Sequence, residues 1–180
     1  YFEIEKGYNI VTASTLVSVS SVCGIVGTVF SGLISDKMFR SNRTIPACLS
    51  SLLNLAALAL FLFGPRQCEI LDIISMILFG ISIGILLCFL GGLMAIDIAP
   101  KEATGAAVGV IGIASYAAAG LQDVVSGFLI ESRKAIIDGN PVYDFSAIRI
   151  FWLSAALVSL LFLLIIWGAR KKHVSSNIHY

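Results

Sequence analysis

Charged side chains are scarce in this chain of 180 residues. Only 13% of the residues are Asp, Glu, Lys or Arg, about half the share found in ordinary soluble domains, whereas 58% are hydrophobic. The mean hydropathy is +0.95. This balance is typical of a protein whose main solvent is lipid, and it excludes an ordinary soluble domain. The net charge of +1 gives no basis for a nucleic-acid partner.

Cysteine and histidine are also few. The four cysteines have no CxxC spacing, so the sequence predicts neither a disulfide framework nor a metal site. Both histidines, His173 and His179, stand in the polar C-terminal tail. No nucleophile–base pair can be assembled from the residues present, and we therefore expect neither an enzyme nor a bound cofactor. The first residues lack both Met and the basic start of a signal peptide, so we expect a fragment.

Long apolar stretches dominate the chain instead. A membrane-spanning helix needs about 20 mainly apolar residues. Five stretches satisfy this requirement: residues 10–35, 44–63, 71–96, 104–130 and 148–169. No stretch alternates as barrel strands do, and we expect an all-α integral membrane protein with five transmembrane helices and no sheet. The longest polar break contains the turn sequence Asp138-Gly139-Asn140-Pro141.

The basic residues indicate an orientation. The loops at residues 36–43 and 97–103 and the tail from Arg170 together hold seven bases and three acids, whereas the segments on the opposite side together hold five bases and seven acids. Cytoplasmic loops carry the excess of Lys and Arg in most membrane proteins. We therefore expect the C-terminus to be cytoplasmic.

Small residues recur at every fourth position in two of the spans. They are Ser20, Gly24, Thr28 and Gly32 in the first span, and Gly80, Gly84, Cys88 and Gly92 in the third. Such ridges let helix backbones approach closely within a membrane. The second and fifth spans are apolar nearly all round. We therefore predict that the first, third and fourth spans are inner helices and that the second and fifth face lipid.

The loop after the first span carries a recognisable motif. Residues 32–43 read Gly-Leu-Ile-Ser-Asp-Lys-Met-Phe-Arg-Ser-Asn-Arg. The pattern formed by Gly32, Asp36, Lys37, Arg40 and Arg43 resembles the signature loop of the major facilitator superfamily, which stabilises one conformational state in those proteins. A short basic loop can also serve only as an anchor that fixes the topology, and this alternative stays open.

Two further strings narrow the resemblance. Residues 99–105 (Ala-Pro-Lys-Glu-Ala-Thr-Gly) and 112–116 (Gly-Ile-Ala-Ser-Tyr) are similar to the organophosphate:phosphate antiporter family, which includes bacterial glycerol-3-phosphate and hexose-6-phosphate transporters. The resemblance covers nearly the whole chain. It implies that residues 1–180 are part of the C-terminal half, that the five spans are helices eight to twelve of a twelve-helix fold, and that the protein lies in the bacterial inner membrane.

The resemblance also implies partners and missing parts. Family members exchange an organic phosphate for inorganic phosphate across the lipid bilayer by alternating access. They clamp the phosphate with arginines of the first and seventh helices, and neither helix is present here. The N-terminal half and the seventh helix are therefore expected as partners. The family also contains a sensor of hexose phosphate that signals to a membrane histidine kinase, and this function is the alternative.

Three residues of the fourth span are the candidate substrate contacts. Tyr116 matches a tyrosine that lines the central cavity of family members. Asp123, an ionisable side chain well inside a span, follows seven residues later and lies within about 20° of the same helix face. Gln122 lies about 100° away and is the weaker candidate. Tyr116 could instead be a packed aromatic, and Asp123 could be protonated or paired with a base on a missing helix.

The cytoplasmic end of the third span is a candidate gate. Asp97 matches an acidic position of the family, and with Lys101 it could act as a gate or as a helix-end charge; Pro100 is predicted to begin the next helix. Some relatives have Tyr-Gly-Pro near the position of Ile85-Leu86-Leu87. We therefore predict that the kink which this proline causes is lost here.

Overall fold

A computed structural model describes residues 1–38, 43–137 and 140–176, and within these ranges the side chains of residues 34, 36, 38, 140 and 169–176 are outside the description. Five helical segments are long and apolar enough to cross a membrane: Ile10–Leu33, Thr44–Phe63, Glu69–Ile98, Lys101–Ser132 and Ser146–Gly168. The predicted all-α membrane class with five spans is confirmed.

The elements follow one another in simple order. The first span lies in α1 (Ile10–Met38) and the second is α2 (Thr44–Phe63). The third consists of α3 (Glu69–Cys88), the π-helical segment η1 (Phe89–Leu93) and α4 (Met94–Ile98). A 3₁₀ turn, η2 (Lys101–Ala103), leads into α5 (Thr104–Ser132). The strands β1 (Lys134–Ile137) and β2 (Asn140–Tyr143) then precede α6 (Ser146–Ser176).

Polar side chains cap two of the helices. The side-chain oxygen of Asn9 accepts a hydrogen bond of 2.8 Å from the backbone N–H of Thr12, which satisfies a free donor at the start of α1. At the start of α6, Asp144 accepts hydrogen bonds from the backbone N–H and the hydroxyl of Ser146. These bonds hold the pKa of Asp144 below its ordinary value, so its carboxylate stays charged and favours the positive helix end.

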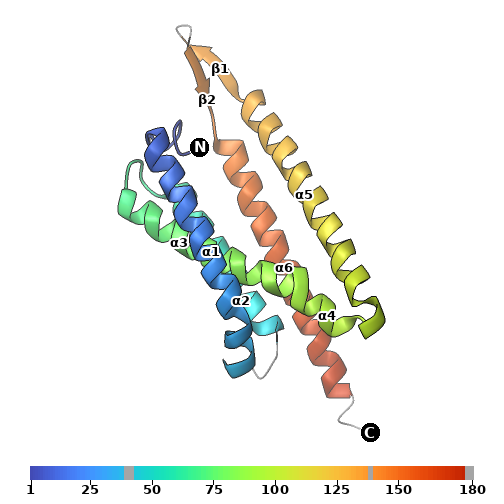
Figure 1. Ribbon diagram of the computed structural model, residues 1–180. Helices are drawn as coiled ribbons and strands as arrows, with labels where there is room; N and C mark the ends of the chain where they lie inside the picture. The colour runs from blue at the N-terminus through green and yellow to red at the C-terminus, as the bar shows by residue number, and fades with distance from the viewer. Residues whose placement is uncertain (39–42, 138–139, 177–180) are drawn as a thin grey trace.

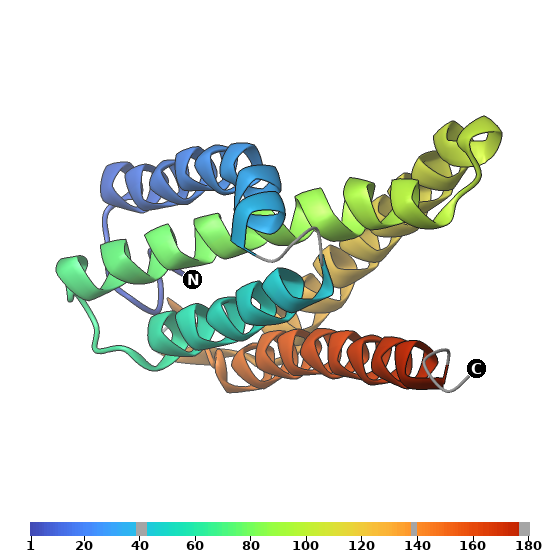
Figure 2. The same ribbon diagram turned by 90° about the horizontal axis from the view of Figure 1, so that it is seen from below.

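The helices form a layered bundle with one outlying member. α3 packs against α1 on one side and against α2 on the other, and α2 packs in turn against α6 (labelled in Figure 1; Figure 2 shows these layers one below the other). Seen from below, α5 diverges from the layers that the other long helices form (Figure 2). In an 18-residue stretch of α2, 39% of the residues are buried within the chain, against 0% in the corresponding stretch of α5. We predicted that the fourth span is an inner helix and that the second faces lipid. Within this chain the arrangement is different, because α2 is enclosed by α3 and α6 whereas little covers α5.

The two ridges of small residues pack against each other. A Cβ added at Gly80 would overlap the carbonyl oxygen of Ser20, and one added at Gly84 would overlap that of Gly24. The hydroxyl of Thr28 donates a hydrogen bond of 3.1 Å to the carbonyl of Gly84. The backbones of α1 and α3 therefore touch directly, as the spacing of small residues predicted. The ridges end before Gly32 and Gly92, where an added Cβ would meet nothing within 4 Å.

The expectation of a chain without sheet is wrong at one place. β1 and β2 pair as an antiparallel hairpin, with Lys134 opposite Tyr143 and Ala135 opposite Val142. The turn sequence at 138–141 is flanked by β-branched and aromatic residues, which favour strands. The hairpin joins α5 to α6 and lies outside the five spans (Figure 1). It leaves the transmembrane architecture unchanged.

The third span lacks the proline of some relatives, and we predicted that the kink which this proline causes is lost here. The helix widens into the π segment η1 a few residues beyond that position. π segments interrupt the usual hydrogen-bond ladder and can bend a helix. The span therefore has an irregular point without a proline.

The α1–α3 contact generates a prediction about stability. Gly84→Val should force the two backbones apart, at a cost of about 1–3 kcal/mol, because the added Cβ would occupy the place of the Gly24 carbonyl oxygen. The apparent melting temperature in detergent should fall by about 2 °C or more. Gly127→Val is the matched control, since a Cβ there would meet nothing within 4 Å. Equal effects of both substitutions would refute the packing argument.

Candidate functional site

The predicted signature loop lies partly outside the described residues. Arg40 and the side chain of Asp36 are among the parts that the structure does not describe, so their predicted role stays a prediction. Lys37 is exposed in the last turn of α1, and Gly32 is half-buried in the same helix. Arg43, the last member of the motif, directly precedes α2.

Arg43 joins the signature loop to the predicted gate. Its Nε lies 2.9 Å from Oδ2 of Asp97 in α4, and the two side chains are 18% and 36% exposed. The Nε–H does not point at the carboxylate, so the contact is an ion pair rather than a hydrogen bond. Nη1 is likewise buried without a hydrogen-bond partner among the described residues. This half-buried pair fixes the end of the third span to the start of α2.

Asp97 and Lys101 were predicted to act as a gate or as helix-end charges, and this role stays a prediction; among the described ion pairs they are not paired with each other. Asp97 pairs with Arg43, whereas Lys101 is exposed in η2 and has no ion-pair partner within the described ranges. The sequence placed all three residues on one side of the membrane. It could not rank the partners, because that choice depends on how α2 and α4 approach each other.

The candidate substrate residues of α5 do not converge on one point. Tyr116 is 84% exposed, and Asp123 is exposed without a hydrogen-bond or ion-pair partner in the described part of the chain. The indole Nε1 of Trp152 in α6 donates a hydrogen bond of 3.1 Å to the hydroxyl of Ser126, so Ser126 marks the face of α5 that meets the bundle. Gln122 lies about 40° from Ser126, whereas Tyr116 lies about 80° away. Their assignment to a substrate site stays a prediction.

Gln122 lines the largest of the cavities described. The cavity has a volume of about 510 Å³ and lies among α1, α2, α3, α5 and α6. Its lining is mainly apolar, and its polar members are Ser20, Asn54 and Gln122, besides the indole of Trp152. Asn54 Nδ2 also donates a hydrogen bond of 3.2 Å to the hydroxyl of Ser82, which links α2 to α3. Because none of the lining residues is a cation, this cavity alone has no group that could neutralise a phosphate.

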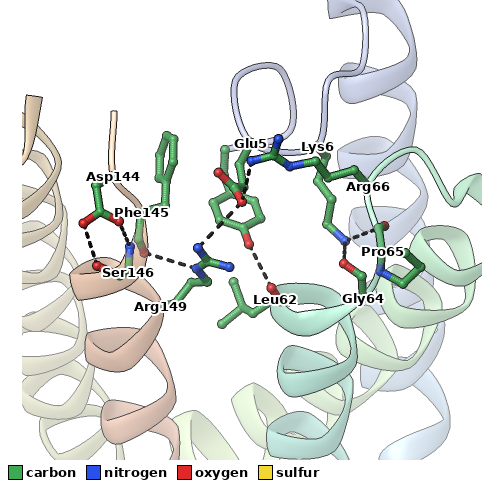
Figure 3. A network of polar contacts seen from close by, with 11 residues as sticks. Glu5, Lys6, Leu62, Gly64, Pro65, Arg66, Asp144, Phe145, Ser146 and Arg149 are labelled. Carbon is green, nitrogen blue, oxygen red and sulfur yellow. Dashed lines mark hydrogen bonds and ion pairs between the residues drawn. The ribbon is translucent and has the colours of Figure 1, made fainter. Parts of the chain in front are cut away.

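A buried ion pair at the other end of the bundle was missed by the sequence analysis. Lys6 and Asp72 are 1% and 0% exposed, and Lys6 Nζ lies 2.9 Å from Oδ1 of Asp72. Nζ also donates to the carbonyl oxygens of Gly64 (3.1 Å) and Pro65 (3.5 Å), as Figure 3 shows. The ammonium therefore has three acceptors, which offset the cost of its burial.

Tyr8 completes the surroundings of Asp72. Its hydroxyl donates a hydrogen bond of 2.7 Å to Oδ2 of Asp72. Burial and this hydrogen bond raise the pKa of Tyr8, so the hydroxyl remains protonated and continues to donate. Both carboxylate oxygens are thereby satisfied. The segment before α1 is tied to the start of α3.

The same N-terminal segment also reaches α2 and α6. The hydroxyl of Tyr1 donates to the carbonyl oxygen of Leu62 at 3.0 Å, and its ring packs edge-on against Phe145. Oε1 of Glu5 lies 3.3 Å from Nη2 of Arg66 and 3.6 Å from Nη2 of Arg149, so Glu5 forms an ion pair with each arginine (Figure 3). Residues 1–8 therefore form a strap across one end of α2, α3 and α6.

One sequence signal could have indicated this cluster. Asp72 is the fourth residue of α3 and is followed by apolar and small residues up to Cys88, in a region where a charge is costly unless it is paired. Lys6 is the base of the polar segment before the first span, on the same side of the membrane. Their separation of 66 positions hides the pairing from any local pattern.

The pair can be tested by stability measurements. Asp72→Asn should lower the free energy of unfolding by about 3–5 kcal/mol, because it leaves the buried Lys6 ammonium without a counter-charge. Lys6→Met combined with Asp72→Asn should recover much of the loss, since both charges are gone. Denaturant titration in mixed micelles measures both variants.

The control for this test is Arg66→Gln. Arg66 is 72% exposed in its pair with Glu5, and its loss should cost less than about 1 kcal/mol. If the double variant were no more stable than Asp72→Asn alone, the two charges would not be coupled.

The described geometry defines the class of the protein. Five apolar helices long enough to span a bilayer, with ion pairs close to their ends, are typical of a helical multi-pass membrane protein. The sequence model of the Major Facilitator Superfamily matches residues 1–122. The chain belongs to this superfamily, which confirms the family inferred from the signature loop.

Individual relatives agree with the narrower resemblance. The chain is 30% identical over 157 residues to the glycerol-3-phosphate transporter of Bacillus subtilis (strain 168), an alignment that covers 84% of this chain and 32% of that protein. It is 31% identical over 126 residues to membrane sensor protein UhpC of Escherichia coli (strain K12), covering 67% of this chain and 27% of the relative. The chain thus spans about a third of the length of these proteins. No solved structure was found to match it.

Proposed function

We propose that this chain is part of a secondary transporter that exchanges an organic phosphate for inorganic phosphate by alternating access. The observation that carries the proposal is the similarity to a glycerol-3-phosphate transporter over 84% of the chain. In such carriers two halves rock about a site near the middle of the membrane. The Arg43–Asp97 pair would act at the inner end, where it would stabilise one of the two states. On this proposal the protein is neither an enzyme nor dependent on a cofactor.

The substrate site would be shared with segments outside this chain. The described cavity is lined by no cation, yet a phosphate needs basic or N–H donors. Because the chain corresponds to about a third of its relatives, we place the phosphate-binding arginines in an N-terminal half and a seventh helix. In that arrangement Tyr116 and Asp123, which are exposed in the described structure, would face the other half. They would contact the organic part of the substrate, with Gln122 beside them.

The orientation follows the distribution of bases. The loop that contains Arg43, the segment after Asp97 and the C-terminal tail would lie in the cytoplasm, and the Lys6–Asp72 cluster would lie on the outer side. The proposed location is the inner membrane of a bacterium.

A sensor is the second candidate function. It is favoured by the 31% identity to membrane sensor protein UhpC. A sensor of the family type would bind a hexose phosphate and signal through a histidine kinase. Binding without transport is therefore the property that separates the two functions.

Exchange in vesicles tests the proposal. The protein that contains this chain should be reconstituted in liposomes loaded with inorganic phosphate, and the entry of labelled glycerol 3-phosphate or glucose 6-phosphate should be followed. An exchanger should take up label only when phosphate is present inside. Binding to the purified protein without uptake would favour the sensor. Neither binding nor uptake of any organic phosphate would contradict both functions.

Asp123 carries the prediction about specificity. Asp123→Ala should change the ratio of uptake for the two organic phosphates by roughly tenfold, the effect expected from one hydrogen bond to a charged group. Exchange of phosphate for phosphate should change much less, because it does not need the organic part. Val124→Ala is the control, since Val124 is an exposed neighbour without charge. Identical losses for every substrate would reduce Asp123 to a structural residue.

A further inference from the structure

The end of the bundle that carries the strap holds two arginines that share one carboxylate. Oε1 of Glu5 forms an ion pair with Nη2 of Arg66 and a second one with Nη2 of Arg149. Figure 3 shows the two guanidinium groups approaching Glu5 from the loop after α2 and from the first turns of α6. The neighbouring Lys6 and Asp72 neutralise each other. Two positive charges therefore meet a single negative charge at this point.

Other contacts hold both arginines in place. Nε of Arg149 donates a hydrogen bond of 3.4 Å to the carbonyl oxygen of Phe145, which orients the guanidinium group. Arg66 is followed by Gln67, whose Nε2 donates a hydrogen bond of 3.2 Å to the carbonyl oxygen of Gly7. The loop that carries Arg66 is thus tied to the strap without the help of Glu5.

The carboxylate of Glu5 satisfies the two arginines poorly. Its Oε1 lies 3.3 Å from Arg66 and 3.6 Å from Arg149, whereas good hydrogen bonds between a guanidinium group and a carboxylate are about 2.7–2.9 Å long. One oxygen atom serves both partners. The side chain of Arg66 is 72% exposed, and an ion pair exposed to this degree contributes little stability. An anion with more oxygen atoms could therefore displace Glu5 at small cost.

We propose that Arg66 and Arg149 form a phosphate-binding site, and that the carboxylate of Glu5 occupies the place of the phosphate group in the structure described here. A phosphate group presents several acceptor oxygens, so each guanidinium group can bind it with two parallel hydrogen bonds. The ligand is either a free phosphate compound in the water or the phosphate of a lipid headgroup. The site goes beyond the proposed exchange, because phosphate can bind here whether or not the protein transports it.

Chemical modification of arginine measures the occupancy of this site without any transport assay. Phenylglyoxal reacts with accessible guanidinium groups, and peptide mass spectrometry gives the rate at each arginine of the whole protein at constant ionic strength. Inorganic phosphate should slow the modification of Arg66 by roughly threefold or more, the effect of a contact between charged groups. The control is Arg133, which is 56% exposed in its ion pair with Asp144 and should react at an unchanged rate. No slowing, or equal slowing at both arginines, would overturn the site.

Two variants test the roles of the individual groups. Glu5→Gln removes the competing charge, so the phosphate concentration that halves the rate at Arg66 should fall by about threefold. Arg149→Gln removes one of the two guanidinium groups, and phosphate should then no longer protect Arg66. Unchanged protection without Arg149 would overturn the shared site, and an unchanged or higher concentration in Glu5→Gln would overturn the place assigned to Glu5. Glu5→Gln keeps the test decisive if Arg149→Gln does not fold.

The surroundings of the protein distinguish the two sources of phosphate. In lipid-free micelles of a neutral detergent, only added inorganic phosphate can protect Arg66. In nanodiscs a lipid headgroup would protect Arg66, relative to Arg133, before any phosphate is added, and Arg149→Gln would remove this protection. Protection by added phosphate in micelles assigns the site to free phosphate, and protection in nanodiscs alone assigns it to lipid. Protection in neither would contradict the proposal.

Discussion

The direct contact between the backbones of α1 and α3 constrains the rest of the structure. Glycines at positions 24, 80 and 84 bring the two helices so close that an added Cβ at Gly80 or Gly84 would overlap a carbonyl oxygen of α1. Lipid gives apolar helices little reason to associate, so close packing and the Thr28–Gly84 hydrogen bond must hold them together. Since α2 packs on the other side of α3, this contact sets the position of the whole layered bundle.

The two ends of the bundle are held in different ways. At the end of the strap, Lys6 and Asp72 are buried with all their partners in place, and separating them would leave a charge in an apolar interior. At the opposite end the half-exposed ion pair of Arg43 and Asp97 ties α4, which directly follows the π segment η1, to the start of α2. A half-exposed pair is much cheaper to break than a buried one. The structure therefore suits a bundle that stays closely packed at the end that holds Lys6 and Asp72 and rearranges at the end that holds Arg43 and Asp97.

The length and spacing patterns of the sequence predicted the five spans and the contact between α1 and α3. Apolar length identified the five spans, and the four-residue spacing of small side chains identified the two surfaces that meet in α1 and α3. The ion pairs between distant residues were not predictable. Lys6 and Asp72 are 66 positions apart in the sequence. For Asp97 the sequence offered two bases on the same side of the membrane, Arg43 and Lys101, and did not show which one it contacts. The short hairpin was missed because four-residue strands carry too little pattern. Helical spacing also related Tyr116 to Asp123, but it cannot say which other helix they face.

The central claim is that the end of the third span that holds Asp97 moves when a ligand binds to the whole protein, while α3 remains fixed on α1. Hydrogen–deuterium exchange of the whole protein in nanodiscs tests it directly, with and without glycerol 3-phosphate. The account predicts that the ligand changes the exchange rates of amides in residues 94–103 and leaves those of residues 72–88 slow and unchanged. A uniform change along the span, or a change confined to residues 72–88, would contradict it.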